Sequence, residues 1–188
     1  PKEVIIDTNG LGISLADEML KTHYDLDGSE LPPYGFFNND DYKKIQPKDS
    51  IPILYSMKAN GPLKSKINGN AYSRLNGGLV RFLISEQEAR NALLGTKAGQ
   101  KMTMRERVQR LLPHEQTTKL FEEMGNLRVK NVGMDIVLEA INKRFHDDRY
   151  YAFAYGLWRI KEIEEAQMKK QRKRGAGKRN LIFFTGGA

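Results

Sequence analysis

Two adjacent carboxylates are the clearest candidates for chemistry in this sequence. Asp147 and Asp148 follow His146 and precede aromatic residues in the stretch "HDDRYYAFAYGLW". The free N–H groups and the dipole of a helix N-terminus favour an acid, so helix capping is the simplest explanation for either aspartate. A cap needs only one acid, however, and no Glu or Gln stands three residues beyond either one to complete a capping box. The surplus charge therefore indicates a divalent cation such as Mg²⁺, which prefers oxygen ligands.

A third carboxylate, Asp7, follows an apolar run near the start of the chain. Residues 4–6, "VII", are β-branched and predict a short buried strand, and residues 8–12 predict a tight turn that leads into a helix. This is the opening half of a βαβ unit, and ligands bind such sheets where the strands end. We therefore expect Asp7 to share a metal with the aspartate pair. The alternative is that its side chain caps the following turn.

Other catalytic patterns are weak or missing. The stretch "NGLGISL" lacks the third glycine of a dinucleotide fingerprint, "GTKAGQKMT" has its glycines too close for a P-loop, and neither HExxH nor GxSxG occurs. Because there is no cysteine, any metal must be held by carboxylates, histidines or carbonyls. We expect His146 either to orient a water or phosphate or to be an ordinary polar residue.

The positive charge is concentrated near the C-terminus. Removing the seven cations of residues 169–179 from the net charge of +8 leaves only +1. Such a block is a solvated arm that in some proteins grips phosphates. It predicts a basic tail over residues 169–188, whose nucleic-acid contacts would be Lys169, Lys170, Arg172, Lys173, Arg174, Lys178 and Arg179. No apolar run approaches the roughly 18 residues of a membrane span and no signal-peptide pattern is present, so we expect a cytosolic protein without membrane contact.

The length and the order of elements predict one α/β domain over residues 1–168, with a parallel or mixed sheet. Further strands are predicted at 51–59 and 77–85. Helices are predicted at 85–96 and from Arg149 to about Lys170, where aromatic residues recur at near-helical spacing.

The remaining segments give weaker predictions. Residues 25–50 are rich in Pro, Asp, Asn and Gly and predict a long surface excursion. Residues 60–70 predict a loop before a helix, and Pro113 is expected to separate two helical pieces. A polar break is expected at 131–133, whereas 134–142 is compatible with either strand or helix.

Two of these stretches together resemble a known family. "VIIDTNGLGISLADEML" and "HDDRYYAFAYGLW" are similar to successive motifs in the nuclease domain of large terminase subunits, the motors that cut and package DNA in tailed bacteriophages. The stretch between them, from "INGNAY" to "GTKAGQKMT", also resembles the middle of phage terminases. Either motif alone is weak, but their order and their separation of about 140 residues strengthen the resemblance.

The resemblance implies a ribonuclease H-like fold, a mixed sheet flanked by helices, in which carboxylates hold two Mg²⁺ or Mn²⁺ ions and hydrolyse DNA phosphodiesters. Asp7 matches the acid that ends the family's second motif strand, and Asp147 and Asp148 match the acids of the last motif, with direct coordination placed on Asp148 slightly ahead of Asp147. The family's first metal-binding aspartate lies on a strand upstream of residue 3, so we expect a truncated longer polypeptide or a strand supplied by a second chain.

The resemblance also implies a setting for this activity. The substrate would be double-stranded concatemeric phage DNA, cut in the host cytoplasm during genome packaging. The partners would be an N-terminal ATPase part of the same protein, a portal and a small terminase subunit.

Two alternatives stay open. One is a non-catalytic nucleic-acid-binding or assembly module in which the tail does the binding and the acidic motifs are caps. The other is a resolvase of the same broad fold that acts on branched DNA.

Overall fold

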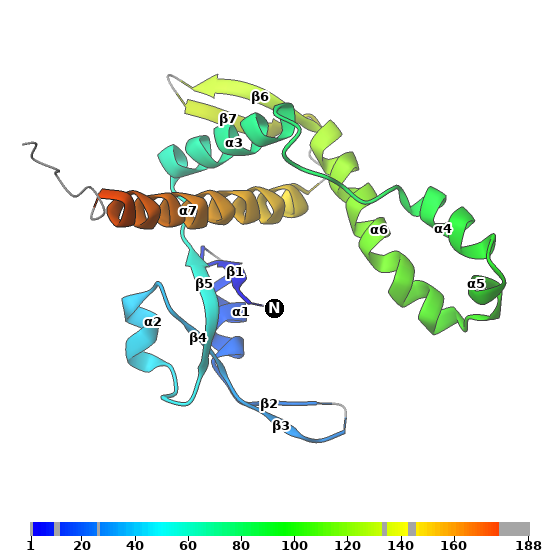
Figure 1. Cartoon of the computed structure of the whole chain (residues 1–188), viewed down its shortest axis with the longest axis horizontal. Helices are drawn as coiled ribbons and strands as arrows, with labels where there is room; N and C mark the ends of the chain where they lie inside the picture. The colour runs from blue at the N-terminus through cyan, green and yellow to red at the C-terminus, as the bar shows by residue number, and fades with distance from the viewer. Residues whose placement is uncertain (1, 10–11, 26, 133–134, 143–145, 177–188) are drawn as a thin grey trace, which may run out of the picture.

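A three-stranded parallel sheet lies at the centre of the part of the molecule that contains both ends of the described chain. Strands β1 (Val4–Asp7), β5 (Ile51–Met57) and β4 (Tyr34–Phe36) lie in the order β1-β5-β4, with Asp7 beside Met57. Figure 1 shows this computed structural model, with helices on either side of the sheet. It describes residues 2–9, 12–25, 27–132, 135–142 and 146–176.

Each face of the sheet has its own core. Ile6 and Leu54 are buried on one face against Ala16 of α1 (Gly12–Met19), together with Phe36. Ile5 and Tyr55 point to the other face, because neighbouring residues of a strand alternate in direction. That second face is covered by α3 (Gly61–Asn76) and by the long helix α7 (Asp148–Ala176).

The start of β1 is tied to the middle of α7 by a bidentate ion pair. The Arg159 guanidinium donates to both carboxylate oxygens of Glu3, at 2.8 and 3.1 Å, and lies 4.3 Å from the centre of the Tyr55 ring. Paired hydrogen bonds of this kind fix orientation as well as distance. The rotation of α7 over β1 is therefore set by specific contacts in addition to apolar packing.

Two antiparallel hairpins lie outside the central sheet. Strands β2 (His23–Tyr24) and β3 (Glu30–Leu31) form a short one. Strands β6 (Leu127–Val132) and β7 (Asp135–Ala140) form a longer one that rests on α3. The Ser65 hydroxyl accepts a hydrogen bond from the backbone N–H of Ile136 at 2.8 Å and so joins the hairpin to the helix.

A helical arm extends from the body (Figure 1). It consists of α4 (Glu86–Leu94), α5 (Lys97–Lys101) and the first half of α6 (Met104–Gly125), and both α4 and α6 begin with complete capping boxes. Helix α2 (Asp40–Ile45) is a separate short element beside β4. None of the described helices has the length and the apolarity needed to cross a bilayer.

The structure confirms the predicted α/β class and the parallel sheet, together with the strands that begin at residues 4 and 51, the helix over 86–94 and the C-terminal helix. It also settles the ambiguous segment as strand β7. Other predictions were wrong.

The predicted surface excursion at 25–50 contains β4, whose Phe36 is only 1% exposed because it stacks on Tyr42 inside the core. The predicted loop at 60–70 is already helix α3, because the Asn60 side chain caps its first turn and Pro62 is tolerated there.

Two further expectations fail, and a third, the polar break at 131–133, is wrong at Asn131. Residues 77–85 form no strand, and several of their apolar side chains are exposed instead of paired in a sheet. Pro113 lies within the continuous helix α6, where its carbonyl accepts a hydrogen bond from the Thr117 hydroxyl at 2.9 Å. Asn131 belongs to strand β6, and Gly133 lies outside the described residues.

The turn after β1 depends on a glycine. A Cβ atom on Gly12 would lie 1.5 Å from the carbonyl oxygen of Asp7, whereas a Cβ on Gly69, in the interior of α3, would have no neighbour within 4 Å. We expect Gly12→Ala to lower the free energy of unfolding by roughly 1–3 kcal/mol, because the end of β1 must move. Gly69→Ala should raise it by roughly 0.5–1 kcal/mol, because alanine favours the helix. Urea unfolding measures both, and equal effects would contradict the close approach at Gly12.

Candidate active site

All three predicted acids line one cleft. The cleft has a volume of about 420 Å³ and lies where β1 ends and α7 begins. Asp7 enters it from β1, and Asp147 and Asp148 enter it from the start of α7. The remaining lining residues are Ile5, Lys64, Tyr151, Ala152 and Tyr155. Folding therefore brings together carboxylates from the two ends of the sequence, as predicted.

The Asp7 carboxylate is held from two sides. Its Oδ1 accepts hydrogen bonds from the backbone N–H and the side-chain amide of Asn9, at 3.0 and 2.9 Å. Its Oδ2 accepts one from the Tyr155 hydroxyl at 3.2 Å. The bond from Asn9 N–H is the turn-capping contact that the alternative interpretation predicted. Capping uses only one oxygen, so it does not exclude a role for Asp7 in the cleft.

The start of α7 is capped by a residue that the sequence did not reveal. Glu123, from the C-terminal end of α6, is only 4% exposed, and its Oε2 accepts hydrogen bonds from the backbone N–H groups of Arg149 and Tyr150 at 2.9 and 3.1 Å. Its Oε1 pairs with the Arg149 guanidinium at 2.6 Å. A buried glutamate thus satisfies the helix N-terminus, which is the task that capping would have given to Asp147 or Asp148.

This cap leaves the aspartate pair without a structural partner. Across the described residues, no hydrogen bond or ion pair engages the carboxylate of either Asp147 or Asp148. Asp147 is half-buried and Asp148 is exposed as the first residue of α7. Two unpaired carboxylates thus face a cleft that already contains the charge of Asp7.

The charges of Asp7 and Asp147 raise the pKa of two tyrosines in the cleft. Burial, and after it the charge of Asp7, raises the pKa of the Tyr155 hydroxyl far above its usual value, and Asp147 adds a smaller contribution. Burial and then the charge of Asp147 raise the pKa of Tyr151. Carboxylates from opposite ends of the chain therefore act on the same hydroxyl, and Tyr155 stays protonated as a hydrogen-bond donor to Asp7 at neutral pH.

Lys64 is the functional candidate that sequence reasoning missed. It extends from the first turn of α3 into the cleft, and its Nζ lies 5.0 Å from the centre of the Tyr151 ring. The sequence predicts a loop for residues 60–70, and a loop assigns no side chain to a helix face. The pattern of Asn60 followed by Pro62 was the available signal for an earlier helix start.

The donor set suits a hard divalent cation, because every acidic ligand in the cleft offers oxygen. Within the described residues, however, no three Asp, Glu or His side chains already form a chelating group. Coordination at this cleft therefore requires the carboxylates to turn toward the ion, or requires further ligands. His146 is exposed and is absent from the residues that line the cleft.

Five of the seven predicted phosphate contacts of the tail lie at the far end of α7. Lys169, Lys170 and Arg172 are exposed on this helix, which continues through the predicted boundary at residue 168 to Ala176. Lys173 and Arg174 belong to the helix as well, and Lys178 and Arg179 lie outside the described residues.

Comparisons with protein-family models, with curated proteins and with solved structures found no match.

The Glu123 cap makes a stability prediction. Glu123→Ala leaves two N–H groups of α7 without their acceptor and removes the ion pair with Arg149, so we expect it to lower the free energy of unfolding by roughly 2–3 kcal/mol. Glu122→Ala changes the exposed neighbouring residue of the same helix and should cost less than about 0.5 kcal/mol. Urea unfolding of the two variants tests this, and similar losses would show that Glu123 is not the cap.

Proposed function

We propose that this chain is the nuclease portion of a terminase large subunit, with a ribonuclease H-like fold, and that its cleft hydrolyses DNA phosphodiesters with Mg²⁺ or Mn²⁺. The observation that carries the proposal is the convergence of Asp7, Asp147 and Asp148 on one cleft, together with the assignment of the helix cap to Glu123. Acids that were only caps would not need to gather from the two ends of the chain.

The acidic, neutral and basic residues of the cleft would have different roles. Asp7 and the aspartate pair would hold the ions, which when bound would activate a water for attack on phosphorus and stabilise the leaving oxygen. Tyr155 and Asn9 hold the Asp7 carboxylate in place, so this side chain would lose little conformational freedom when an ion binds. Lys64 gives the same cleft a positive charge that would contact a phosphate of the substrate.

The unpaired edge of β1 is a place where a further strand, carrying another metal ligand, can add to the sheet. Among the described strands, β1 pairs only with β5, so its other edge is unpaired. We infer that a strand from a longer polypeptide or from a second chain pairs there and carries the additional aspartate that the resemblance implies. A strand that pairs there in parallel, as β5 does on the other edge, would end beside Asp7.

The biological setting follows from the resemblance. The substrate would be concatemeric phage DNA in the host cytoplasm, with an ATPase part of the same protein, a portal and a small subunit as partners. The alternative of a non-catalytic module is less well supported, because the start of α7 already has its cap in Glu123. A branched-DNA resolvase would use the same cleft, and a comparison of branched with linear substrates separates it from a terminase.

The metal assignment predicts a specific pattern of Mn²⁺ binding. Calorimetry on this chain should detect Mn²⁺ binding that Asp7→Asn and Asp147→Asn each weaken at least about 10-fold, as expected when a ligand charge is removed. Asp49→Asn removes the same charge at an exposed residue outside the cleft and should leave the affinity unchanged. If all three variants bind Mn²⁺ as the unmodified chain does, the cleft is not the metal site.

Cleavage is the second test. The longest polypeptide that carries these residues should cleave plasmid DNA in Mn²⁺, and Asp7→Ala or Asp148→Ala should reduce the rate by at least about 100-fold, because each removes a ligand of the catalytic ions. The folding of each variant is checked by urea unfolding. An unchanged rate in both well-folded variants would refute the catalytic assignment.

A further inference from the structure

The tip of the helical arm has a concentration of positive charge that the whole-chain balance hides. Residues 97–110 contain five Lys or Arg and a single acid, Glu106. We propose that this tip binds the phosphates of duplex DNA outside the cleft. We call four of its cations the basic tip: Lys97, Lys101, Arg105 and Arg110.

The basic tip is free to take an external anion. All four side chains belong to exposed residues, and within the described parts of the chain no ion pair or hydrogen bond holds any of them. Glu106, the acid among them, is occupied, because its carboxylate accepts hydrogen bonds from the backbone N–H and the hydroxyl of Thr103 at 2.7 and 2.8 Å. The charge of the tip is therefore not neutralised by ion pairs within the described chain.

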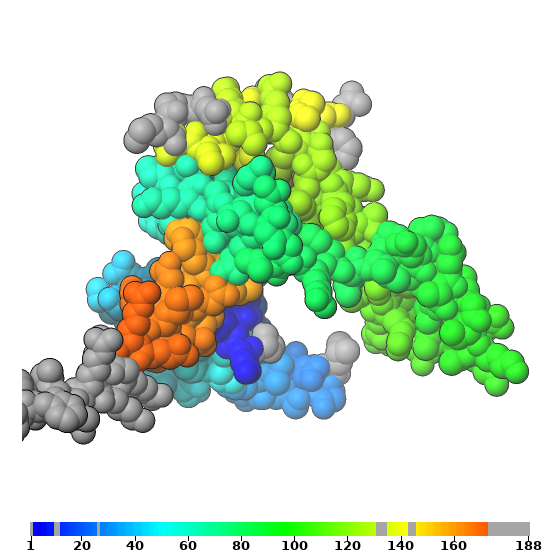
Figure 2. Space-filling view, turned by 45° about the horizontal axis from the view of Figure 1, so that its top comes forward, coloured from blue at the N-terminus to red at the C-terminus, as the bar shows by residue number. Residues whose placement is uncertain are grey.

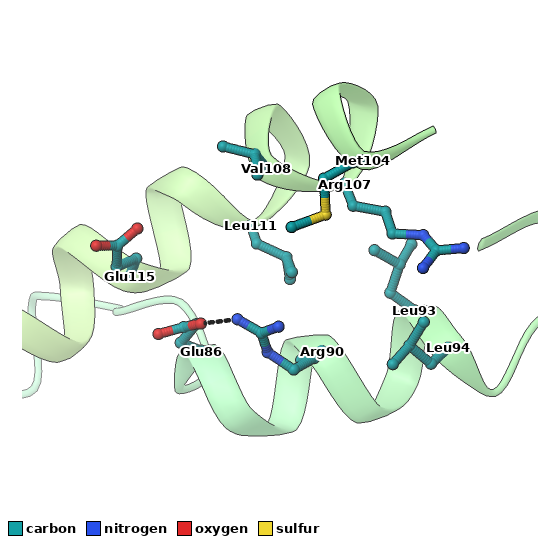
Figure 3. A pocket seen from close by; sticks show the side chains of 9 residues that line it. All are labelled: Glu86, Arg90, Leu93, Leu94, Met104, Arg107, Val108, Leu111 and Glu115. Atoms are coloured by element: carbon teal, nitrogen blue, oxygen red, sulfur yellow. Dashed lines mark hydrogen bonds and ion pairs between the residues drawn. The ribbon is translucent and has the colours of Figure 1, made fainter. Parts of the chain in front are cut away.

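Cations nearer the base of the arm behave differently. Arg90 pairs with Glu86, and Lys119 pairs with Glu115. Figure 3 shows Arg90 turned toward Glu86 within a pocket between α4 and α6, below Leu111. The cations of the basic tip are thus unpaired in the described chain, whereas these two are paired; Lys97, Lys101 and Arg105 lie around the junction of α5 and α6, and Arg110 lines a pocket beside Leu111.

Contacts among α4, α5 and α6 fix the conformation of the tip. A Cβ atom on Gly99 would lie 1.9 Å from the carbonyl oxygen of Leu93, so α5 packs directly on α4 at that point. Lys97 and Lys101 stand two residues to either side of Gly99 and therefore project from the opposite face of α5. The Arg107 guanidinium donates to the carbonyl of Gln100 at 2.6 Å and ties α5 to α6.

The distance between the basic tip and the cleft is one that a straight DNA duplex can span. From Arg105 to Glu123, which caps α7 beside the cleft, α6 advances by about 27 Å at 1.5 Å per residue. B-DNA covers this distance in about 8 base pairs and is nearly straight over it, given its persistence length of about 50 nm. In Figure 2 an open notch separates the arm from the part of the body that contains β1. A duplex that reaches from the basic tip to the cleft would span the gap between the arm and this part of the body.

This inference rests on the proposed function only for the identity of the ligand in the cleft, and its test avoids the metal. The tip variant replaces the four cations of the basic tip by glutamine. The matched control replaces Lys21, Lys43, Lys44 and Lys48 by glutamine, which removes the same charge from the region of α1 and α2. Affinity for a fluorescent duplex is measured by anisotropy in EDTA over a series of salt concentrations, and urea unfolding confirms that both variants are folded.

We expect the tip variant to bind the duplex roughly 10- to 100-fold more weakly at low salt and to lose about 2 to 4 units from the slope of log affinity against log salt, since each phosphate contact contributes about 0.9. The control should change far less, because three of its four lysines already pair with acids. Equal affinities and slopes for the two variants would overturn the proposal. Mn²⁺ affinities that Asp7→Asn and Asp147→Asn leave unchanged would remove the metal assignment and leave this result intact.

Discussion

The packing of α7 across β1 is the constraint on which the site depends. Two specific contacts fix it, the ion pair between Glu3 and Arg159 at the start of the strand and the hydrogen bond between Tyr155 and Asp7 at its end. The beginning of α7 therefore lies beside the carboxyl end of β1, where Asp7 and the aspartate pair line one cleft.

Glu123 caps α7 and so leaves the carboxylates of Asp147 and Asp148 available to the cleft. A helix N-terminus attracts negative charge, and without another acceptor it would draw in the nearest aspartate. Because Glu123 fills that position from α6 and is itself paired with Arg149, the charges of Asp147 and Asp148 remain directed at solvent and at the cleft. The hydrogen bonds that orient Asp7 come from neutral groups and leave its charge in place. Among the described residues that line the cleft, three carboxylates face a single lysine, Lys64, so an excess of negative charge remains for a bound cation to balance.

Sequence reasoning succeeded where a single local pattern determines structure. Asp7 could be placed because a β-branched run and a turn define the end of β1, and the aspartate pair because it precedes a long aromatic-rich helix. Phe36 was missed because its strand has three residues in a segment rich in turn formers, and its place in the sheet comes from long-range packing. Lys64 was missed as a consequence of the loop assigned to its segment, and Glu123 because a cap donated by another helix leaves no local pattern. The basic tip was hidden because charge was summed over the chain and not over a folded surface.

The contact between Tyr155 and Asp7 spans 148 positions of sequence, and the one between Arg159 and Glu3 spans 156. Contacts of such separation form late, because the entropy of closing a long loop is lost before they can stabilise anything. While this chain is still emerging from the ribosome, β1 has neither its covering helix nor the second set of acids. The cleft is consequently assembled only after α7 has been synthesised, and a growing chain cannot carry out whatever chemistry the completed cleft performs.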